Sequence, residues 1–408
     1  MTRSARYENL LVTLMFLTFG TIFLDRMAQF YLAPYLIPDL HVNNIQIGMM
    51  ASALALAWAL SCVVFGAICD RYGRRVVLVP AVFAFSLMSW LTGVVETFGQ
   101  MLLVRFLLGI AEGACYAPVM AISEAASSPH RRGINVGIVV AAAGFVGNAV
   151  APILTTQVAA YIGWRWSFFV AGVPGVILGF FIWKYVEEPV KSAAADMQRP
   201  QFKEFFSVVR YRNVVLCCFA GAANLTSIFF FQVFSPLYIT QVAHQAPTTA
   251  GFLIGAGGVG GTIAGIAYPA FSDRIGRKPI LLLSSAASIF FPLALLVPTL
   301  YHDLWLLAAI EFVISTNAVI PSLVLVVIPT ETVPARLGAT AIGVTTMTAE
   351  LIGATIAPTI GGIFAQRMGL AVPLIIASGM NIVLFLLCAM LRETRGRKAV
   401  QLTSAPAH

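Results

Sequence analysis

The chain has 408 residues, of which 59% are hydrophobic and only 10% are charged. A soluble domain carries about 25% charged residues, so this composition excludes an ordinary soluble protein and indicates an integral membrane protein. The formal net charge of +8 would suit a nucleic-acid partner, but the placement of the charges argues against one. Most Lys and Arg residues fall in the chain ends and in alternate loops, which predicts that both termini are cytoplasmic.

About twelve apolar runs are long enough to cross a bilayer core of about 30 Å. They cover residues 10–37, 45–69, 76–95, 100–123, 134–161, 165–186, 211–239, 249–272, 279–299, 304–329, 338–366 and 370–391. The long polar stretch after the sixth run predicts a cytoplasmic linker at 187–210, in which residues 202–206 could form a short surface helix. We therefore expect a six-helix bundle at 1–186, a second at 211–391 and a cytoplasmic tail at 392–408.

Charged residues interrupt the first and fourth apolar runs. Asp25 and Arg26 lie in the first run, and Arg105 and Glu112 lie in the fourth, seven residues apart and so within about 20° on one helix face. Each such residue costs roughly 2.5–3.5 kcal/mol on insertion scales, so it usually faces a cavity or a partner. We interpret Asp25 and Glu112 as proton carriers of a membrane transporter and Arg26 and Arg105 as ligands for an anion. A buried structural ion-pair network is the alternative.

Other polar positions occur mainly in the second half of the chain. Glu350, in the eleventh run, is a candidate second proton site or a protonated hydrogen-bond donor, whereas Glu311, nearer a run end, is expected to be solvated. Candidates for contacts with substrate hydroxyls are Asn224, Gln232 and Asn317, although hydrogen bonds between helices are an equally common use. Candidates for shaping a cavity are Tyr31, Tyr35, Trp58 and Tyr116, and plain packing is the alternative.

The chain contains an internal repeat. Asp70-Arg-Tyr-Gly-Arg-Arg75 returns as Asp273-Arg-Ile-Gly-Arg-Lys278, 203 residues later, and Gly147–Pro152 resembles Gly353–Pro358. Six helices per copy preserve orientation, so the copies should be related by an axis along the membrane normal. We expect the repeated loops to latch one access state through the gating residues Gly66, Asp70, Arg71, Gly73, Arg74, Asp273, Arg274, Gly276 and Arg277.

Several weaker motifs are set aside. Residues 255–260 match GxGxxG but lie inside an apolar run with no preceding strand, which excludes a nucleotide site there. Gly257, Gly261 and Gly265 instead predict a close helix-packing face. The six cysteines lie in or beside apolar runs without CxxC spacing, and no His falls within a run, so we expect no metal site and no cofactor.

The motifs resemble those of a known family. The segment from Gly66 through Asp70-Arg71-Tyr-Gly73-Arg74-Arg75 resembles the loop 2–3 signature of the major facilitator superfamily, although the second copy has Pro269 at the glycine position. Arg105-Phe-Leu-Leu-Gly109 and Glu187-Glu188-Pro189 are similar to its helix-four and helix-six motifs. The resemblance covers about residues 10–391 and implies twelve transmembrane helices in two pseudo-symmetric six-helix bundles, an all-α fold that works by alternating access.

A narrower resemblance suggests a substrate class. Leu24-Asp25-Arg26, Ala33–Leu36 and Arg105–Ala114 are similar to the anion:cation symporter family, with Met27-Ala28-Gln29 as a departure from its commoner pattern. This implies proton-coupled symport of a small organic anion, a sugar acid or other carboxylate. From the sequence itself we expect a bacterial plasma (inner) membrane, because the loops are compact and the tails short, and a single working chain, because twelve helices suffice for alternating access. We expect no enzymatic activity, because no nucleophile–base arrangement occurs, and no nucleic-acid partner, because the basic residues follow the topology. Spinster-type transporters share similar motifs, so a lysolipid transporter is the alternative, as is a proton-driven drug exporter.

Overall fold

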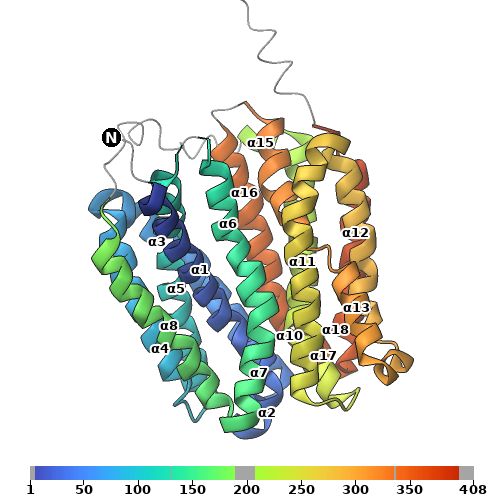
Figure 1. Cartoon of the computed structure of the whole chain (residues 1–408). Helices are drawn as coiled ribbons and strands as arrows, with labels where there is room; N and C mark the ends of the chain where they lie inside the picture. The colour runs from blue at the N-terminus through green and yellow to red at the C-terminus, as the bar shows by residue number, and fades with distance from the viewer. Residues whose placement is uncertain (1–4, 129, 189–206, 335–336, 395–408) are drawn as a thin grey trace, which may run out of the picture.

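The computed structural model describes residues 5–128, 130–188, 207–334 and 337–394, and these form helices joined by short connections (Figure 1). The helices of the first half are α1 (Ala5–Tyr31), α2 (Ala33–Leu40), α3 (Asn44–Tyr72), α4 (Arg74–Thr92), α5 (Phe98–Ala126), α6 (Arg132–Ala142), η1 (Ala143–Val150), α7 (Ala151–Ile162) and α8 (Trp164–Tyr185). The surface helix expected at 202–206, most of the linker and most of the tail lie outside the described residues.

The second half repeats this order with more interruptions. Its helices are α10 (Arg212–Gln241), α11 (Pro247–Ile275), α12 (Arg277–Ala294), η3 (Pro298–His302), α13 (Leu304–Ile314), α14 (Val319–Pro321), η4 (Ser322–Val327), α15 (Ile328–Thr332), α16 (Gly338–Ala349), η6 (Glu350–Ile356), α17 (Ala357–Met368) and α18 (Ala371–Met390). No strand occurs among the residues that the structure describes. The all-α fold class is therefore confirmed.

Eleven helices in the described ranges are long and apolar enough to cross a membrane. The twelfth expected span is α12, which has 18 residues and begins with Arg277 and Lys278. These two charged residues lower the mean hydropathy of α12, and α12 is not among the eleven helices. The twelve-span count and the domain boundaries therefore stay predictions.

Backbone features recur at matching positions of the two halves. Gly73 and Gly276 adopt φ of 112° and 121°, and Gly163 and Gly369 both adopt φ of 98°. Glycine reaches these angles without steric cost, so each glycine allows a sharp turn between two consecutive helices. These shared turns support the internal repeat that the DRxGRR-like loops predict.

The second sequence echo coincides with π-helical turns. In each half a π-helical stretch, η1 or η6, interrupts a long helix and is followed by Ala151-Pro152 or Ala357-Pro358. Proline provides no backbone N–H, so the hydrogen-bond ladder is disturbed there and the helix accommodates a π turn. Both turns lie midway along a membrane-spanning run.

The two halves pack against each other at the face where α2, α7 and α17 lie, which we call the closed face (Figure 1). Here the Thr359 hydroxyl of α17 donates to the Ser52 hydroxyl of α3 (2.8 Å), and the Asn44 N–H donates to the Gln366 side chain (3.2 Å). A Cβ atom on Gly48 would collide with the Pro358 carbonyl, so the backbones of α3 and α17 nearly touch.

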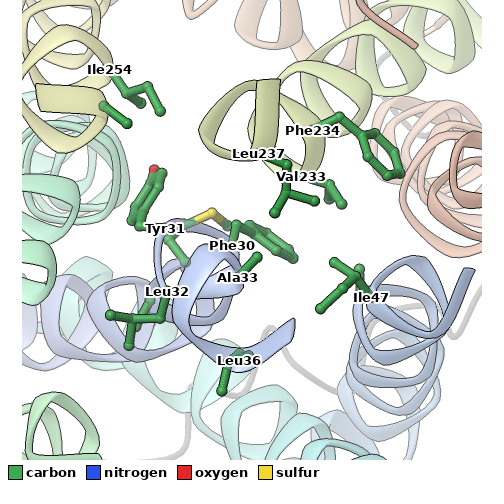
Figure 2. Close-up of a cluster of buried hydrophobic side chains, with 14 of the residues drawn as sticks. Phe30, Tyr31, Leu32, Ala33, Leu36, Ile47, Val233, Phe234, Leu237 and Ile254 are labelled. Atoms are coloured by element: carbon green, nitrogen blue, oxygen red, sulfur yellow. The ribbon is translucent and has the colours of Figure 1, made fainter. Parts of the chain in front are cut away.

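An apolar cluster fills the closed face above these contacts. Figure 2 shows its side chains converging from α1, α2, α3, α10 and α11. The labelled members are Phe30, Tyr31, Leu32, Ala33, Leu36, Ile47, Val233, Phe234, Leu237 and Ile254. The opposite face, where α1 begins and α18 ends, is called the termini face.

Not every helical glycine marks a close contact. In α6 and α16, a Cβ atom on Gly133, Gly137 or Gly343 would have open space around it.

Candidate functional site

Asp25 lies inside the first half of the chain. One carboxylate oxygen accepts a hydrogen bond of 2.6 Å from the Ser89 hydroxyl of α4, which also lies 2.9 Å from the Phe168 carbonyl oxygen of α8. Asp25 is fully buried, and its second oxygen has no hydrogen-bond partner among the described residues. Asp25 therefore connects α1 with α4 and α8.

Arg105 is enclosed in the same region. Its guanidinium carbon lies 4.7 Å from the centre of the Phe168 ring, and no nitrogen of the group has a hydrogen-bond partner in the described ranges. It interacts electrostatically with Asp25 and with Glu112. Arg105 is completely buried and is not among the residues that line the cleft between the halves, so its role in substrate binding stays a prediction.

Glu112 lies between the two arginines. Its exposed fraction is 1%, and neither carboxylate oxygen has a hydrogen-bond partner within the described part of the chain. Electrostatically it interacts with Arg26 and, less strongly, with Asp25 and Arg105. The seven-residue spacing thus places Arg105 and Glu112 close enough for their charges to interact, as predicted.

Arg26 extends toward the boundary between the halves. Its guanidinium carbon lies 4.9 Å from the centre of the Trp58 ring, and the group interacts electrostatically with Glu350 of η6. The ion pairs shorter than 4 Å in the described ranges involve Arg131, Arg132, Arg165 and Arg277 instead. Arg26 is thus a buried cation, 4% exposed, without a carboxylate of the described residues in direct contact.

A cleft of about 90 Å³ lies between the halves. Its walls come from α1, η1, α10, α11, α12 and the chain after α13. The lining residues are Tyr31, Gly144, Asn148, Ile228, Phe231, Gln232, Ile254, Gly257, Gly258, Gly261, Thr262, Phe291, Ser315, Asn317 and Ala318. The lining is thus mostly apolar with a few hydroxyl and amide groups, a composition typical of small-molecule sites.

Three of the predicted substrate contacts line this cleft. The Gln232 amide N–H donates to the Asn148 side-chain oxygen across the halves (3.0 Å). The side-chain oxygen of Gln232 has no partner among the described residues. The Asn317 side-chain oxygen is likewise unpartnered there. Tyr31 donates to the Gly147 carbonyl (3.2 Å). Sequence reasoning missed Asn148, although an amide inside an apolar run was a usable signal.

The other predicted polar and aromatic contacts lie away from the cleft lining. Asn224 is buried, and both atoms of its amide lack partners within the described residues. Tyr116 contacts the Trp58 ring with centroids 5.4 Å apart, and it interacts electrostatically with Glu350. Tyr35 packs against the apolar cluster of the closed face. Roles for Asn224, Tyr35 and Tyr116 in substrate binding stay predictions.

The expectation that Glu311 is solvated is wrong. Its exposed fraction is 1%, and both carboxylate oxygens are buried without a hydrogen-bond partner among the described residues. The helix that carries it, α13, ends at Ile314, and α11 covers it closely. Its position near the end of an apolar run predicts contact with water, but the packing of α13 against α11 excludes water from the Glu311 side chain.

The predicted gating loop of the first half is held by a residue outside the motif. Glu188 accepts hydrogen bonds from the backbone N–H groups of Arg74 (2.6 Å) and Arg75 (2.9 Å) at the start of α4. The Arg74 guanidinium donates to the Ala121 carbonyl (3.1 Å), whereas Asp70 is exposed in the last turn of α3. Asp70 lies at the C-terminal end of α3, where the free backbone groups are carbonyls and not N–H groups. Glu188, and not Asp70, therefore provides the carboxylate at the N-terminus of α4.

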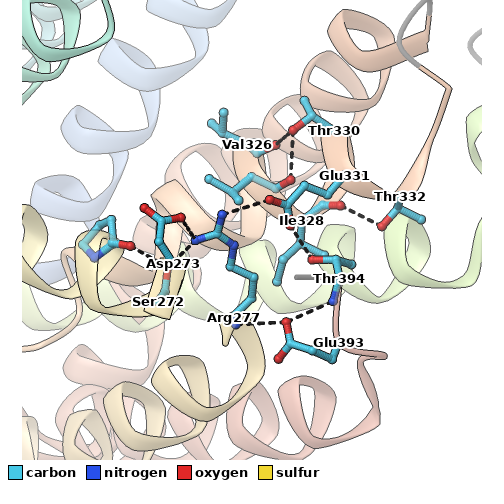
Figure 3. Close-up of polar contacts among 12 residues, drawn as sticks. Ser272, Asp273, Arg277, Val326, Ile328, Thr330, Glu331, Thr332, Glu393 and Thr394 are labelled. Atoms are coloured by element: carbon cyan, nitrogen blue, oxygen red, sulfur yellow. Dashed lines mark hydrogen bonds and ion pairs between the residues drawn. The ribbon is translucent and has the colours of Figure 1, made fainter. Parts of the chain in front are cut away.

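The second gating loop repeats this pattern with additional charges (Figure 3). Glu393 accepts from the N–H groups of Arg277 and Lys278 (both 3.0 Å), as Glu188 does in the first half. The Arg277 side chain pairs with Asp273 (2.5 Å) and with Glu331 (2.9 Å). The gating roles of both loops stay predictions, although the shared geometry shows that they are structural equivalents.

Metal-ligand side chains do not gather in the part of the chain that the structure describes. No group of three or more His, Cys, Asp and Glu residues is placed to hold a metal ion there. Among these residues the six cysteines are free thiols, all buried except the half-buried Cys62.

Comparison with known families identifies the chain. The model of the Major Facilitator Superfamily matches residues 14–354. The chain belongs to this superfamily. It is therefore a multi-pass membrane transporter and not an enzyme.

Curated relatives include several transporters of organic acids. The chain is 26% identical to the hexuronate transporter of Bacillus subtilis (strain 168) over 57% of each chain. It is 25% identical to a probable galactarate/D-glucarate transporter of Escherichia coli (strain K12) over 67% of each chain. A 3-(3-hydroxy-phenyl)propionate transporter of the same E. coli strain is also 25% identical, over 54% of this chain and 55% of the relative. The match thus spans little more than half the length of some relatives.

Solved structures share the fold. A bacterial homologue of the lysosomal transporter Spinster, in an inward-facing and occupied conformation, superposes with a TM-score of 0.75 at 18% identity, covering 99% of this chain and 100% of that one. The nucleoside transporter NupG superposes with a TM-score of 0.74 at 16% identity, covering 95% and 100%. At these identities the likeness concerns the fold alone.

Proposed function

We propose that this transporter carries a small organic anion, a sugar acid or other carboxylate, together with protons by alternating access. The observation that carries the proposal is Arg26, a buried guanidinium at the boundary of the halves that no carboxylate in the described part of the chain contacts directly. Glu112 and Glu350 interact with this charge only at a distance, and burying a cation without a direct ion pair is costly, so an anion supplied from solution would complete the site. A guanidinium binds a carboxylate through two parallel hydrogen bonds.

Arg26 itself is not among the residues that line the cleft in this state, so a side-chain movement would bring it to an anion whose other groups occupy the cleft. Gln232, Asn317, Asn148 and Ser315 offer hydroxyl and amide groups that suit the hydroxyls of a sugar acid. The relatives named as hexuronate and galactarate/D-glucarate transporters support this substrate class. In the state described here, Arg105 would contribute to the anion site only through its charge.

Proton coupling would occur at the acids around the arginines. Glu112 has no hydrogen-bond donor among the described residues and interacts with both arginines, so its charge state should respond to an anion arriving at Arg26. Glu350 interacts with Arg26 from the second half and would be a second acid in the same network. Asp25 differs from both acids in having the Ser89 hydroxyl as a hydrogen-bond partner.

We assign the termini face to the cytoplasm of a bacterial inner membrane, because most basic residues fall there. The closed face would then be extracytoplasmic, and the state described here would be inward-facing. One chain holds the whole proposed site, so we propose a monomer as the working unit.

Uptake into proteoliposomes tests this function. The panel consists of labelled sugar acids and simple carboxylates, assayed with and without an inward proton gradient. Gradient-stimulated uptake of one anion, lost in Arg26→Ala, is the expected result. Folded protein that takes up none of these anions would reject the proposal.

A lysolipid or hydrophobic drug is the second candidate substrate. The observation that favours it is the apolar part of the cleft, where the Phe231 and Phe291 rings are in contact, tilted by 35° with centroids 4.3 Å apart, beside Ile228 and Ile254. Lysophospholipids and hydrophobic cations would form the second panel, and the unchanged uptake of either by Arg26→Ala would support this candidate.

A further inference from the structure

Glu311 is a buried acid for which neither the cleft nor the arginine network provides a partner. Its exposed fraction is 1%, and both carboxylate oxygens lack a hydrogen-bond donor among the described residues. No charged side chain in the described ranges interacts electrostatically with it. By comparison, Asp25 has a Ser89 donor and Glu112 has two arginines nearby.

The elements packed on α13 supply no counter-charge. On α11 the charged residues are Asp273 and Arg274, and on α12 they are Arg277 and Lys278, all beside the connection between these helices at the termini face (Figure 1). On η3 the titratable residues are Tyr301 and His302. His302 is exposed, and the phenol of Tyr301 interacts electrostatically with Glu311 while its hydroxyl donates to the Leu295 carbonyl (2.9 Å). An ionised carboxylate left alone in such a site is strongly disfavoured, and binding a proton removes the charge.

The position of Glu311 relates it to the boundary between the halves. Ser315, one helical turn further on, lines the cleft. The intervening wall is the glycine face of α11, where Gly257 approaches the Glu311 carbonyl and Gly258 lies against the backbone of Asn148 in η1. Helix α11, together with the Phe291 ring packed on Gly257, therefore separates the neighbourhood of Glu311 from the contact between the halves at η1.

We propose that Glu311 is a proton-binding site of the second half, sealed in the state described here and open to exchange with the closed face once the halves separate there. The proposal rests on the alternating access proposed above. A single proton needs no further ligand, whereas an alkali cation would need several oxygens that this apolar site does not supply. Separation of α11 from η1 would admit water to the cleft beside Ser315 and allow the proton to leave.

Infrared spectroscopy of the purified protein tests the first part without any transported anion. A protonated carboxyl has a carbonyl stretch that an ionised carboxylate lacks. We expect one such band at neutral pH to be lost in Glu311→Gln and retained in Glu124→Gln, whose carboxylate is exposed and paired with Arg132 (3.4 Å). Glu311→Asp should shift the band without removing it, which separates loss of the proton from loss of the fold. A band unchanged in Glu311→Gln would overturn the proposal.

A cross-link across the closed face tests the access part. Cysteines replacing Asn44 and Gln366, joined by a short bifunctional thiol reagent in a background without the six native cysteines, would hold α3 against α17. We expect the Glu311 band to persist at alkaline pH in the cross-linked protein and to disappear in the protein that is free to open. Identical titration in both, or loss of the band on adding sodium at constant pH, would overturn the proposal. Either failure leaves the anion symport proposal intact.

Discussion

Asp25 and Arg26 are consecutive residues of α1, yet their side chains reach different parts of the molecule. Asp25 accepts a hydrogen bond from Ser89 inside the first half, whereas Arg26 stacks on Trp58 and interacts with Glu350 of the second half. Consecutive side chains on a helix are about 100° apart, which makes this separation possible. One dipeptide thus connects the buried acid network to the boundary where the halves must move.

The anion role of Arg26 predicts a large loss on neutral substitution. Arg26→Gln should lower gradient-driven anion uptake by about 100-fold, since hydrogen bonds to charged groups contribute about 1.5–3 kcal/mol each and about 1.4 kcal/mol is a factor of ten. Arg132→Gln, which removes an exposed guanidinium paired with Glu124, should leave uptake nearly unchanged. Equal losses in the two variants would contradict the assignment.

The coupling role of Glu112 predicts a separation of two transport modes. Glu112→Gln keeps the side-chain volume but cannot release a proton, so net uptake should no longer respond to the proton gradient. Exchange of internal for external anion needs no net proton movement and should continue. Counterflow and net uptake measured in the same proteoliposomes check this, and a preserved gradient response would reject Glu112 as the carrier.

The Ser89 hydrogen bond predicts a difference between two buried serines of α4. Ser89→Ala leaves the buried Asp25 carboxyl oxygen without its hydrogen-bond partner and should destabilise the protein by about 1–3 kcal/mol. Ser86→Ala removes a hydroxyl that bonds only to the Val82 carbonyl of its own helix (3.0 Å), and should cost less than about 1 kcal/mol. Thermal unfolding of both variants in one detergent gives the comparison, and equal shifts would show that Asp25 does not depend on Ser89.

The charged residues of the site could be identified from the sequence, but the directions in which their side chains point could not. The sequence of α1 has apolar residues on every face of the helix, so it contains no hydrophobic stripe that would indicate which way Asp25 or Arg26 points. By contrast, the spacing of Gly257, Gly261 and Gly265 correctly predicted a packing face: a Cβ on Gly261 would lie 3.0 Å from the Ser315 hydroxyl, and one on Gly265 would lie 3.4 Å from Ala318. Local spacing is visible in a sequence, whereas facing direction depends on partners far along the chain.

Two further features depend on long-range contacts. The tenth apolar run reads as one helix, but the chain leaves the helical conformation at Ser315, where φ is −74° and ψ is 72°. No Gly or Pro marks this break, and the Ser284 carbonyl of α12 accepts a hydrogen bond from Thr316 there (2.9 Å). Similarly, the capping of α4 by Glu188 joins residues more than 100 positions apart. Neither could be predicted from local propensity.

The Asp39–Arg165 pair predicts an acid-dependent contribution to stability outside the membrane-spanning helices. The Arg165 guanidinium, together with the Trp164 indole N–H (3.0 Å), holds the pKa of Asp39 below its usual value. A lowered pKa stabilises the folded protein above the ordinary Asp pKa of about 4, and this contribution is lost as the pH falls through the lowered value. Asp39→Asn should therefore lose less stability on acidification than the parent. Parallel pH profiles of the melting temperature would contradict this.

The closed face predicts that a side chain at Gly48 shifts the access equilibrium. Any Cβ there would meet the Pro358 carbonyl backbone, so Gly48→Val should separate α3 from α17 and populate a state open at that face. Gly343→Val is the matched control, because Gly343 also lies within a helix but has open space beside it. Both substitutions place valine in a helix, so effects on helix propensity should cancel. Distances between spin labels on α3 and α17 should lengthen in Gly48→Val alone. If they stay unchanged while the protein remains folded, the contact between Gly48 and Pro358 does not control closure of this face.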